Sequence, residues 1–135
     1  MSKLLAIDFG MKRCGIAVTD DAQIIASGLT TVDSKKLLQF IIDYRKENDL
    51  EAFVLGEPKR LDGSETHSSQ NVIKLKEQLE QDFGLPVYMV DERFTSKMAF
   101  QTMIDSGLKK KDRRNKALVD EISATIILQS YLESR

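Results

Sequence analysis

The spacing of apolar residues predicts three short strands at the start of the chain. The run LLAIDF at residues 4–9 has the length and composition of a buried strand. Residues 14–19 and 23–31 predict two more strands, and the intervening pair Asp20-Asp21 predicts a hairpin turn. Strands connected this closely run antiparallel, because parallel neighbours need a long crossover.

The pattern then changes to helices alternating with strands. Apolar residues at helical spacing predict helices from about 33 to 48, 68 to 83 and 115 to 132, and a short one beginning at 95 or 96. Asp33 or Ser34 can cap the first of these, and Gly84 ends the second. Apolar runs at residues 52–56 and 87–90 predict two further strands. The order βββ-α-β-α-β-α-α predicts an α/β domain with a mixed sheet and helices on both faces.

Carboxylates accompany two of the predicted strands. Asp8 lies inside the first strand, where an unpaired charge would be costly. Asp91 and Glu92 follow the strand at 87–90, at the edge where open α/β sheets bind ligands. If that strand neighbours the first, its acid and Asp8 converge, and their repulsion favours a bound cation. The alternatives are that Asp8 caps a loop and that Asp91-Glu92-Arg93 is a surface cluster with an internal ion pair.

The last predicted helix carries a further pair of acids, Asp120 and Glu121, among mostly apolar residues. Such a helix is expected to be largely buried, so the acid that faces inward needs a metal or a basic partner. Helical periodicity does not choose between the two acids, and the basic candidates are Arg113, Arg114 and Lys116. Without a cluster of His or Cys, these oxygen ligands suit Mg²⁺ or Mn²⁺ rather than zinc.

The composition indicates the class of protein, where it acts and what it binds. The 135 residues are 41% hydrophobic and 30% charged, as in an ordinary globular protein, and Cys14 is the only cysteine. We find neither a membrane-spanning run nor a signal peptide, and we expect a cytoplasmic protein without a membrane partner. The net charge is −1, but residues 109–116 hold six basic side chains against Asp112. This concentrated basic segment predicts contact with a polyanion.

Four segments, taken together, resemble the YqgF/RuvX family of Holliday junction resolvases, also described as nucleases that process the 5′ end of pre-16S rRNA. They occur in the family's order and cover nearly the whole chain: AIDFGMKRCGIAVTD (6–20), VLGEPKRLDGSE (54–65), VDERFTSKMA (90–99) and KKKDRRNKALVDEISATIILQSYL (109–132). The resemblance implies one RNase H-like nuclease domain over residues 1–135. The expected fold is a five-stranded α/β sheet of order 3-2-1-4-5, with strand 2 antiparallel.

The resemblance also implies the site residues. It assigns the catalytic, metal-binding carboxylates to Asp8, Glu92 and Asp120, with Asp91 possible in place of Glu92. The expected nucleic-acid contacts are Arg13 and Arg93 from the family motifs and Lys59, Arg60, Lys109, Lys110, Lys111, Arg113 and Arg114 from the basic segments. The chain departs from the family at Gly56-Glu57-Pro58, where Gly-Leu-Pro is more usual. This leaves the effect of Glu57 on substrate binding open.

The resulting hypothesis is a hydrolase that cleaves nucleic-acid phosphodiesters with two Mg²⁺ or Mn²⁺ ions, one activating water and the other stabilising the leaving oxygen. The expected substrate is the 5′ end of pre-16S rRNA, processed during ribosome biogenesis. The alternative substrate is a four-way DNA junction. A junction resolvase needs two active sites related by a two-fold axis, so a homodimer would favour DNA, whereas a monomer would favour RNA.

Two other classes of protein fit parts of the pattern. A strand followed by Asp-x-Gly and a second strand also resembles the phosphate-binding hairpin of the actin-like and sugar-kinase ATPases. Those proteins clasp a nucleotide between two such lobes, and measured ATP turnover would favour them here. A non-catalytic nucleic-acid-binding module is the other alternative, and a metal titration would separate it from a nuclease.

Overall fold

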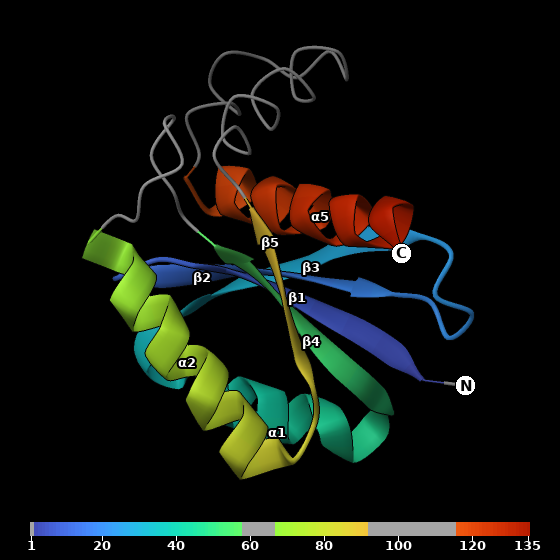
Figure 1. Ribbon diagram of the computed structural model, residues 1–135, viewed down its shortest axis with the longest axis horizontal. Helices are drawn as coiled ribbons and strands as arrows, with labels where there is room; N and C mark the ends of the chain where they lie inside the picture. The colour runs from blue at the N-terminus through green and yellow to red at the C-terminus, as the bar shows by residue number, and fades with distance from the viewer. Residues whose placement is uncertain (1, 58–66, 92–115) are drawn as a thin grey trace.

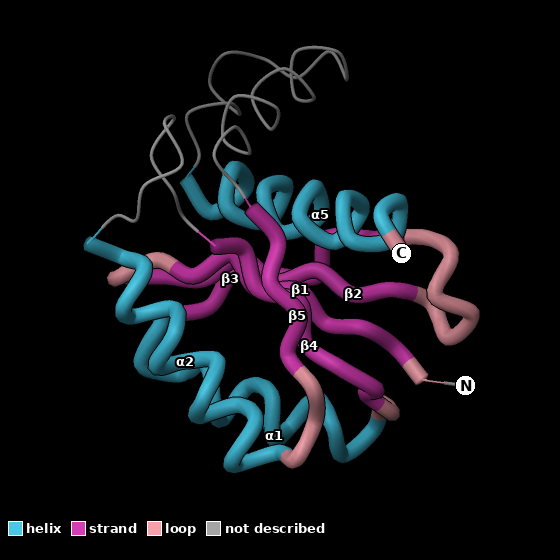
Figure 2. Tube along the Cα trace, viewed as in Figure 1, coloured by secondary structure: helices cyan, strands magenta, loops and turns pink. Residues whose placement is uncertain are grey.

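Five strands of the described chain form one mixed sheet (Figures 1 and 2). The computed structural model describes residues 2–57, 67–91 and 116–135. The strands are β1 (Lys3–Phe9), β2 (Arg13–Thr19), β3 (Ala26–Asp33), β4 (Leu50–Glu57) and β5 (Val87–Asp91), and their order in the sheet is β3-β2-β1-β4-β5. The strand β2 pairs antiparallel with β1 and β3, whereas β4 pairs parallel with β1 and β5. The predicted order and the antiparallel second strand are confirmed.

Helices cover both faces of this sheet. A 3-10 turn (η1, Ser34–Lys36) leads into α1 (Leu37–Glu47), which lies with α2 (His67–Phe83) on one face. On the opposite face, α5 (Lys116–Ser134) crosses β1, β2 and β3 (Figure 1). No helix in the described ranges is long and apolar enough to cross a membrane. The helix predicted from residue 95 or 96 lies outside the described residues.

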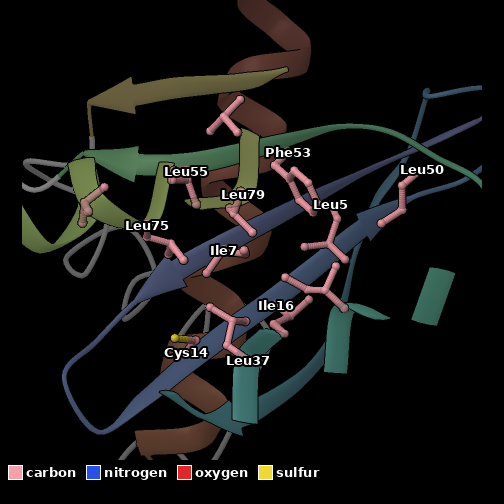
Figure 3. Close-up of a cluster of buried hydrophobic side chains, with 13 residues drawn as sticks. Leu5, Ile7, Cys14, Ile16, Leu37, Leu50, Phe53, Leu55, Leu75 and Leu79 are labelled. Atoms are coloured by element: carbon pink, nitrogen blue, oxygen red, sulfur yellow. The ribbon is translucent and has the colours of Figure 1, made fainter. Parts of the chain in front are cut away.

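Each face of the sheet buries its own apolar layer. The layer beneath α1 and α2 is built on Leu5, Ile7, Ile16 and Phe53, all fully buried, and meets Leu79 of α2 (Figure 3). The layer beneath α5 uses smaller strand residues, among them Ala6, Ala17 and Ala52, against Ala124, Ile127 and Leu128 of the helix. Small side chains on the sheet let α5 approach the strands closely, and this approach positions the site described below.

The loop between β2 and β3 is longer than the predicted two-residue turn, so β3 begins at Ala26 rather than at residue 23. The Asp20 carboxylate accepts hydrogen bonds from the backbone N–H groups of Ile24 (2.8 Å) and Ile25 (3.0 Å). These bonds hold the pKa of Asp20 below its usual value. They tie residues up to 25 into the loop, which delays the start of the strand.

The start of the first helix also differs from the prediction. Neither Asp33 nor Ser34 caps it: Asp33 makes no side-chain capping bond, and the Ser34 hydroxyl donates instead to the carbonyl of Gly10 at 2.5 Å. The helix α1 begins only after the 3-10 turn. At the other predicted boundary, Gly84 adopts φ of +66°, which favours glycine, and ends α2 as expected.

Candidate active site

Asp8 lies on the face of the sheet that α5 covers. Leu4 and Ala6 of β1 pack beneath α5, whereas Leu5 and Ile7 point toward α1 and α2. Successive residues of a strand point to opposite faces, so Asp8 continues the row of Leu4 and Ala6. It is half-buried near the carboxyl end of β1.

Gly15 of β2 allows α5 to contact the sheet beside Asp8. Asp8 and Gly15 are directly paired across the antiparallel ladder, a relation that places two Cα atoms about 4.5–5.5 Å apart. A Cβ atom added to Gly15 would lie 1.9 Å from the backbone oxygen of Asp120 and 2.9 Å from the nitrogen of Glu121. Only glycine permits such contact, so the backbone of Asp120 lies over the strand position next to Asp8.

Asp8 and Asp120 both act electrostatically on Cys14, the neighbour of Gly15. The Cys14 thiol is fully buried, and it is within 3.5 Å of the Ser34 hydroxyl. Burial raises its pKa most, and the negative charges of Asp8 and Asp120 raise it further. Two acids more than a hundred residues apart in the sequence therefore lie in one neighbourhood.

Arg13, at the start of β2, forms an ion pair with Asp120. The distance from Arg13 Nε to Asp120 Oδ2 is 3.5 Å, and the two side chains remain 35% and 28% exposed. The sequence did not suggest this pairing. Arg113 and Arg114, considered there as partners for Asp120, lie outside the described residues, and the side chain of Lys116 is not described.

The structure distinguishes the two acids of the last helix. Glu121 lies against β3, where a Cβ atom added to Gly28 would be 2.6 Å from Glu121 Oε1. Asp120 instead lies over β2, beside Arg13 and next to the Asp8 position. Helical periodicity could not make this choice, because it depends on which strands α5 crosses.

The strand that precedes the predicted third acid, β5, lies on the far side of β4 from β1. The expected convergence with Asp8 assumed that the strand at 87–90 is a direct neighbour of the first strand. Instead, β5 pairs with β4 and not with β1, so this assumption was wrong. The carboxyl ends of the three parallel strands still share one edge of the sheet, and Glu57 and Asp91 are register partners there. The expected ligand Glu92 and most expected nucleic-acid contacts lie outside the described residues: Lys59, Arg60, Arg93, Lys109, Lys110, Lys111, Arg113 and Arg114.

The chemistry of the described donors fits a hard divalent cation. Asp8 and Asp120 contribute carboxylate oxygens, which Mg²⁺ and Mn²⁺ prefer. Within residues 2–57, 67–91 and 116–135, no group of three His, Cys, Asp or Glu side chains could hold a metal ion. Of the three expected ligands, Asp8 and Asp120 lie in the described chain and Glu92 does not.

Sequence reasoning missed the residues that assemble the site. Gly15 carries no chemistry, and the signal that could have marked it is a glycine inside an apolar strand, which indicates close approach of another backbone. The pairing of Arg13 with Asp120 had no comparable signal, because it depends on a contact distant in sequence.

The fold is that of the RNase H-like proteins. The RuvC protein of T. thermophilus, solved in complex with a Holliday junction substrate, superposes with a TM-score of 0.56 over 99% of this chain and 96% of that chain. The two sequences are 16% identical, so this likeness concerns the fold alone.

The sequence comparisons are more specific. A family model described as "RuvX: Holliday junction resolvase" matches residues 2–134, and the chain belongs to this family. A protein of Phocaeicola vulgatus is 56% identical over 100% of this chain and 98% of its own length. A protein of Flavobacterium psychrophilum is 56% identical over 98% of this chain and 97% of its own length. Both carry the name "Putative pre-16S rRNA nuclease", so the expected family is confirmed.

Proposed function

We propose that this protein is a metal-dependent nuclease that hydrolyses phosphodiester bonds, with the 5′ end of pre-16S rRNA as its substrate. The observation that carries the proposal is the approach of α5 to β2 at Gly15, which brings Asp120 beside Asp8. The names of the full-length relatives support the nuclease class and the RNA substrate.

The proposed metal ligands are Asp8, Asp120 and Glu92. Bound Mg²⁺ or Mn²⁺, in the proposed two-ion arrangement, would lower the pKa of water and stabilise the leaving oxygen. The described residues hold and orient the acids: the β1–β2 ladder fixes Asp8, and the packing of α5 on Gly15 fixes Asp120. No protein nucleophile is required.

Glu92 is preferred over Asp91 because of the alternation along β5. Val90 packs in the layer beneath α5, and Tyr88 stacks on Tyr131 of that helix, with ring centroids 5.1 Å apart. Even-numbered positions of β5 thus share the face of Asp8 and Asp120. If the alternation continued one residue past the end of β5, residue 92 would fall on this face, which supports Glu92 as the proposed ligand.

Four-way junction DNA is the second candidate substrate, favoured by the description of the family model. Resolution of a junction requires two symmetric incisions and hence a dimer with two active sites. Cleavage of labelled junctions beside labelled 5′-extended pre-16S rRNA, each with Mg²⁺, Mn²⁺ or EDTA, separates the two. Cleavage of the junction alone by a stable dimer would overturn the RNA assignment.

The variant Asp8→Asn tests the nuclease proposal itself. We expect it to lose metal-dependent cleavage while keeping its fold and most of its nucleic-acid affinity, because the amide keeps the shape but loses the negative charge. Asp21→Asn is the matched control, since Asp21 is exposed in the loop at the opposite end of β2. Full activity of Asp8→Asn would end the proposal.

A further inference from the structure

Arg13 occupies an unusual position for a residue expected to hold substrate phosphate. It belongs to the face of β2 that α5 covers, because Cys14 and Ile16 point to the opposite layer. Its guanidinium lies beside Asp120, one of the two described acids proposed to bind the metal. The two side chains are 35% and 28% exposed and their Nε–Oδ2 distance is 3.5 Å, so solvent screens this contact and it can open at little cost.

We propose that Arg13 is an exchangeable counter-ion: it neutralises Asp120 in the free protein and moves to the nucleic-acid phosphate when substrate binds. This proposal rests on the proposed nuclease function and deepens it. Its consequence is that nucleic acid and the divalent metal ion bind cooperatively. Bound nucleic acid draws the Arg13 guanidinium away from Asp120, and the guanidinium then no longer competes with the metal ion for that carboxylate.

The physical basis is competition for one carboxylate. The Arg13 guanidinium and a divalent ion would both bind the Asp120 carboxylate oxygens, and two cations beside one carboxylate repel each other. A phosphate offers the guanidinium a stronger partner, since arginine can bind it through two parallel hydrogen bonds. Whatever favours the departure of Arg13 therefore favours metal binding, and the coupling is reciprocal.

Mn²⁺ binding to the free protein tests the first half of the exchange. Calorimetric titration of the full chain, without nucleic acid, compares wild type with Arg13→Gln. We expect the variant to bind Mn²⁺ about two- to five-fold more tightly, the range of a partly exposed ion pair. Arg13→Lys keeps the charge and should bind Mn²⁺ with the affinity of wild type.

A control must separate this exchange from a general effect of charge. Lys12 is the exposed neighbour of Arg13 in the sequence, and Lys12→Gln removes the same charge without removing the contact to Asp120. We expect Lys12→Gln to change Mn²⁺ affinity less than Arg13→Gln does. An equal gain in both variants would show a general charge effect and overturn the exchange.

Nucleic-acid binding tests the second half. Binding of fluorescein-labelled 5′-extended pre-16S rRNA in EDTA, where no cleavage occurs, should be weaker for Arg13→Gln than for wild type. The signs of the two effects are the decisive feature: tighter metal and weaker RNA. A merely structural role for Arg13 would weaken both, and circular dichroism of each variant establishes that the fold is kept.

The outcomes separate this inference from the proposed function. If wild type binds Mn²⁺ and cleaves RNA, but Arg13→Gln binds Mn²⁺ no more tightly, the exchange is wrong and the nuclease proposal stands. If wild type binds no Mn²⁺ with or without RNA, the nuclease proposal fails and the exchange fails with it. Tighter Mn²⁺ binding with weaker RNA binding supports both.

Discussion

The substitution Gly15→Ala is the sharpest test of how the fold assembles the site. It adds one methyl group on the face of β2 that α5 covers, directly opposite Asp8 in the ladder. The new Cβ atom would lie 1.9 Å from the backbone oxygen of Asp120 and 2.3 Å from its carbonyl carbon. Both are backbone atoms near the start of α5, so no side-chain rotation can relieve the contact.

The size of the effect follows from that distance. A Cβ contact below 3.0 Å essentially never occurs, so α5 must move from β2 by more than 1 Å. A misplacement of about 1 Å costs a catalytic site on the order of a hundred-fold in rate, whereas overpacking costs about 1–3 kcal/mol of stability. We therefore expect Gly15→Ala to lose activity far more than it loses stability.

The measurement is kcat/KM for cleavage of 5′-extended pre-16S rRNA with Mn²⁺, paired with urea unfolding of the same preparation. Gly28→Ala is the matched control: it adds a methyl group on the neighbouring strand beneath the next helical residue. There the closest atom is the carboxylate oxygen of the flexible Glu121 side chain, at 2.6 Å. We expect this control to keep most of the activity.

Activity of Gly15→Ala within two-fold of wild type would refute the reasoning, because the helix could then shift without disturbing the acids. Equal losses of activity in Gly15→Ala and Gly28→Ala would also contradict it. In that case activity would depend on the position of α5 as a whole and not on its contact with Gly15. The urea data give the fraction folded in each assay, so that loss of folded protein is not counted as loss of chemistry.

Two further predictions concern stability. Cys14 holds its proton in the folded protein because burial, and then Asp8 and Asp120, raise its pKa, whereas the unfolded chain releases it near the ordinary value of 9.0. The free energy of unfolding, measured in urea, should therefore fall more steeply above pH 9 for wild type than for Cys14→Ala; parallel pH profiles would contradict this. Thr19 is buried, and its hydroxyl oxygen accepts a hydrogen bond from the Leu4 N–H at 2.8 Å. We expect Thr19→Val to lower the free energy of unfolding by about 1–3 kcal/mol, because the buried N–H loses its partner, and Thr19→Ser to lower it much less. Equal urea midpoints for the two variants would show that this bond is unimportant.

The fold could be predicted from the sequence because its signals are local. Period-two and helical spacing, with Gly84 as a stop, located β1, β2, β4, β5, α2 and α5 to within about two residues, the usual uncertainty of element ends. The first helix was expected from residue 33 or 34, but α1 begins at Leu37. The errors occurred where side chains replace regular backbone bonds. Asp20 holds the residues before β3 in a loop, and Ser34 bonds to Gly10 instead of capping a helix.

The candidate site was predictable only in its chemistry. Asp8 and Asp120 could be recognised as acids placed among apolar residues, and the family motifs named the same two. Their proximity could not be read from spacing, since it depends on α5 crossing β2 at a residue without a side chain. The assignment of Glu92, and the contacts of the basic segment at 109–116, stay predictions, because the side chains of these residues are not described.

The packing and the electrostatics of the site have a common origin at the start of β2. Three consecutive residues provide a cation for Asp120 at Arg13, a buried thiol in the layer beneath α1 and α2 at Cys14, and the contact surface for α5 at Gly15. Because Gly15 fixes where Asp120 lies, it also fixes which cation Asp120 meets. A change at Gly15 should therefore alter the ion pair and the metal ligands together, whereas a change at Arg13 alters only the charge beside Asp120. Comparing Mn²⁺ affinity in the two variants distinguishes these effects: Gly15→Ala should weaken it, and Arg13→Gln should strengthen it.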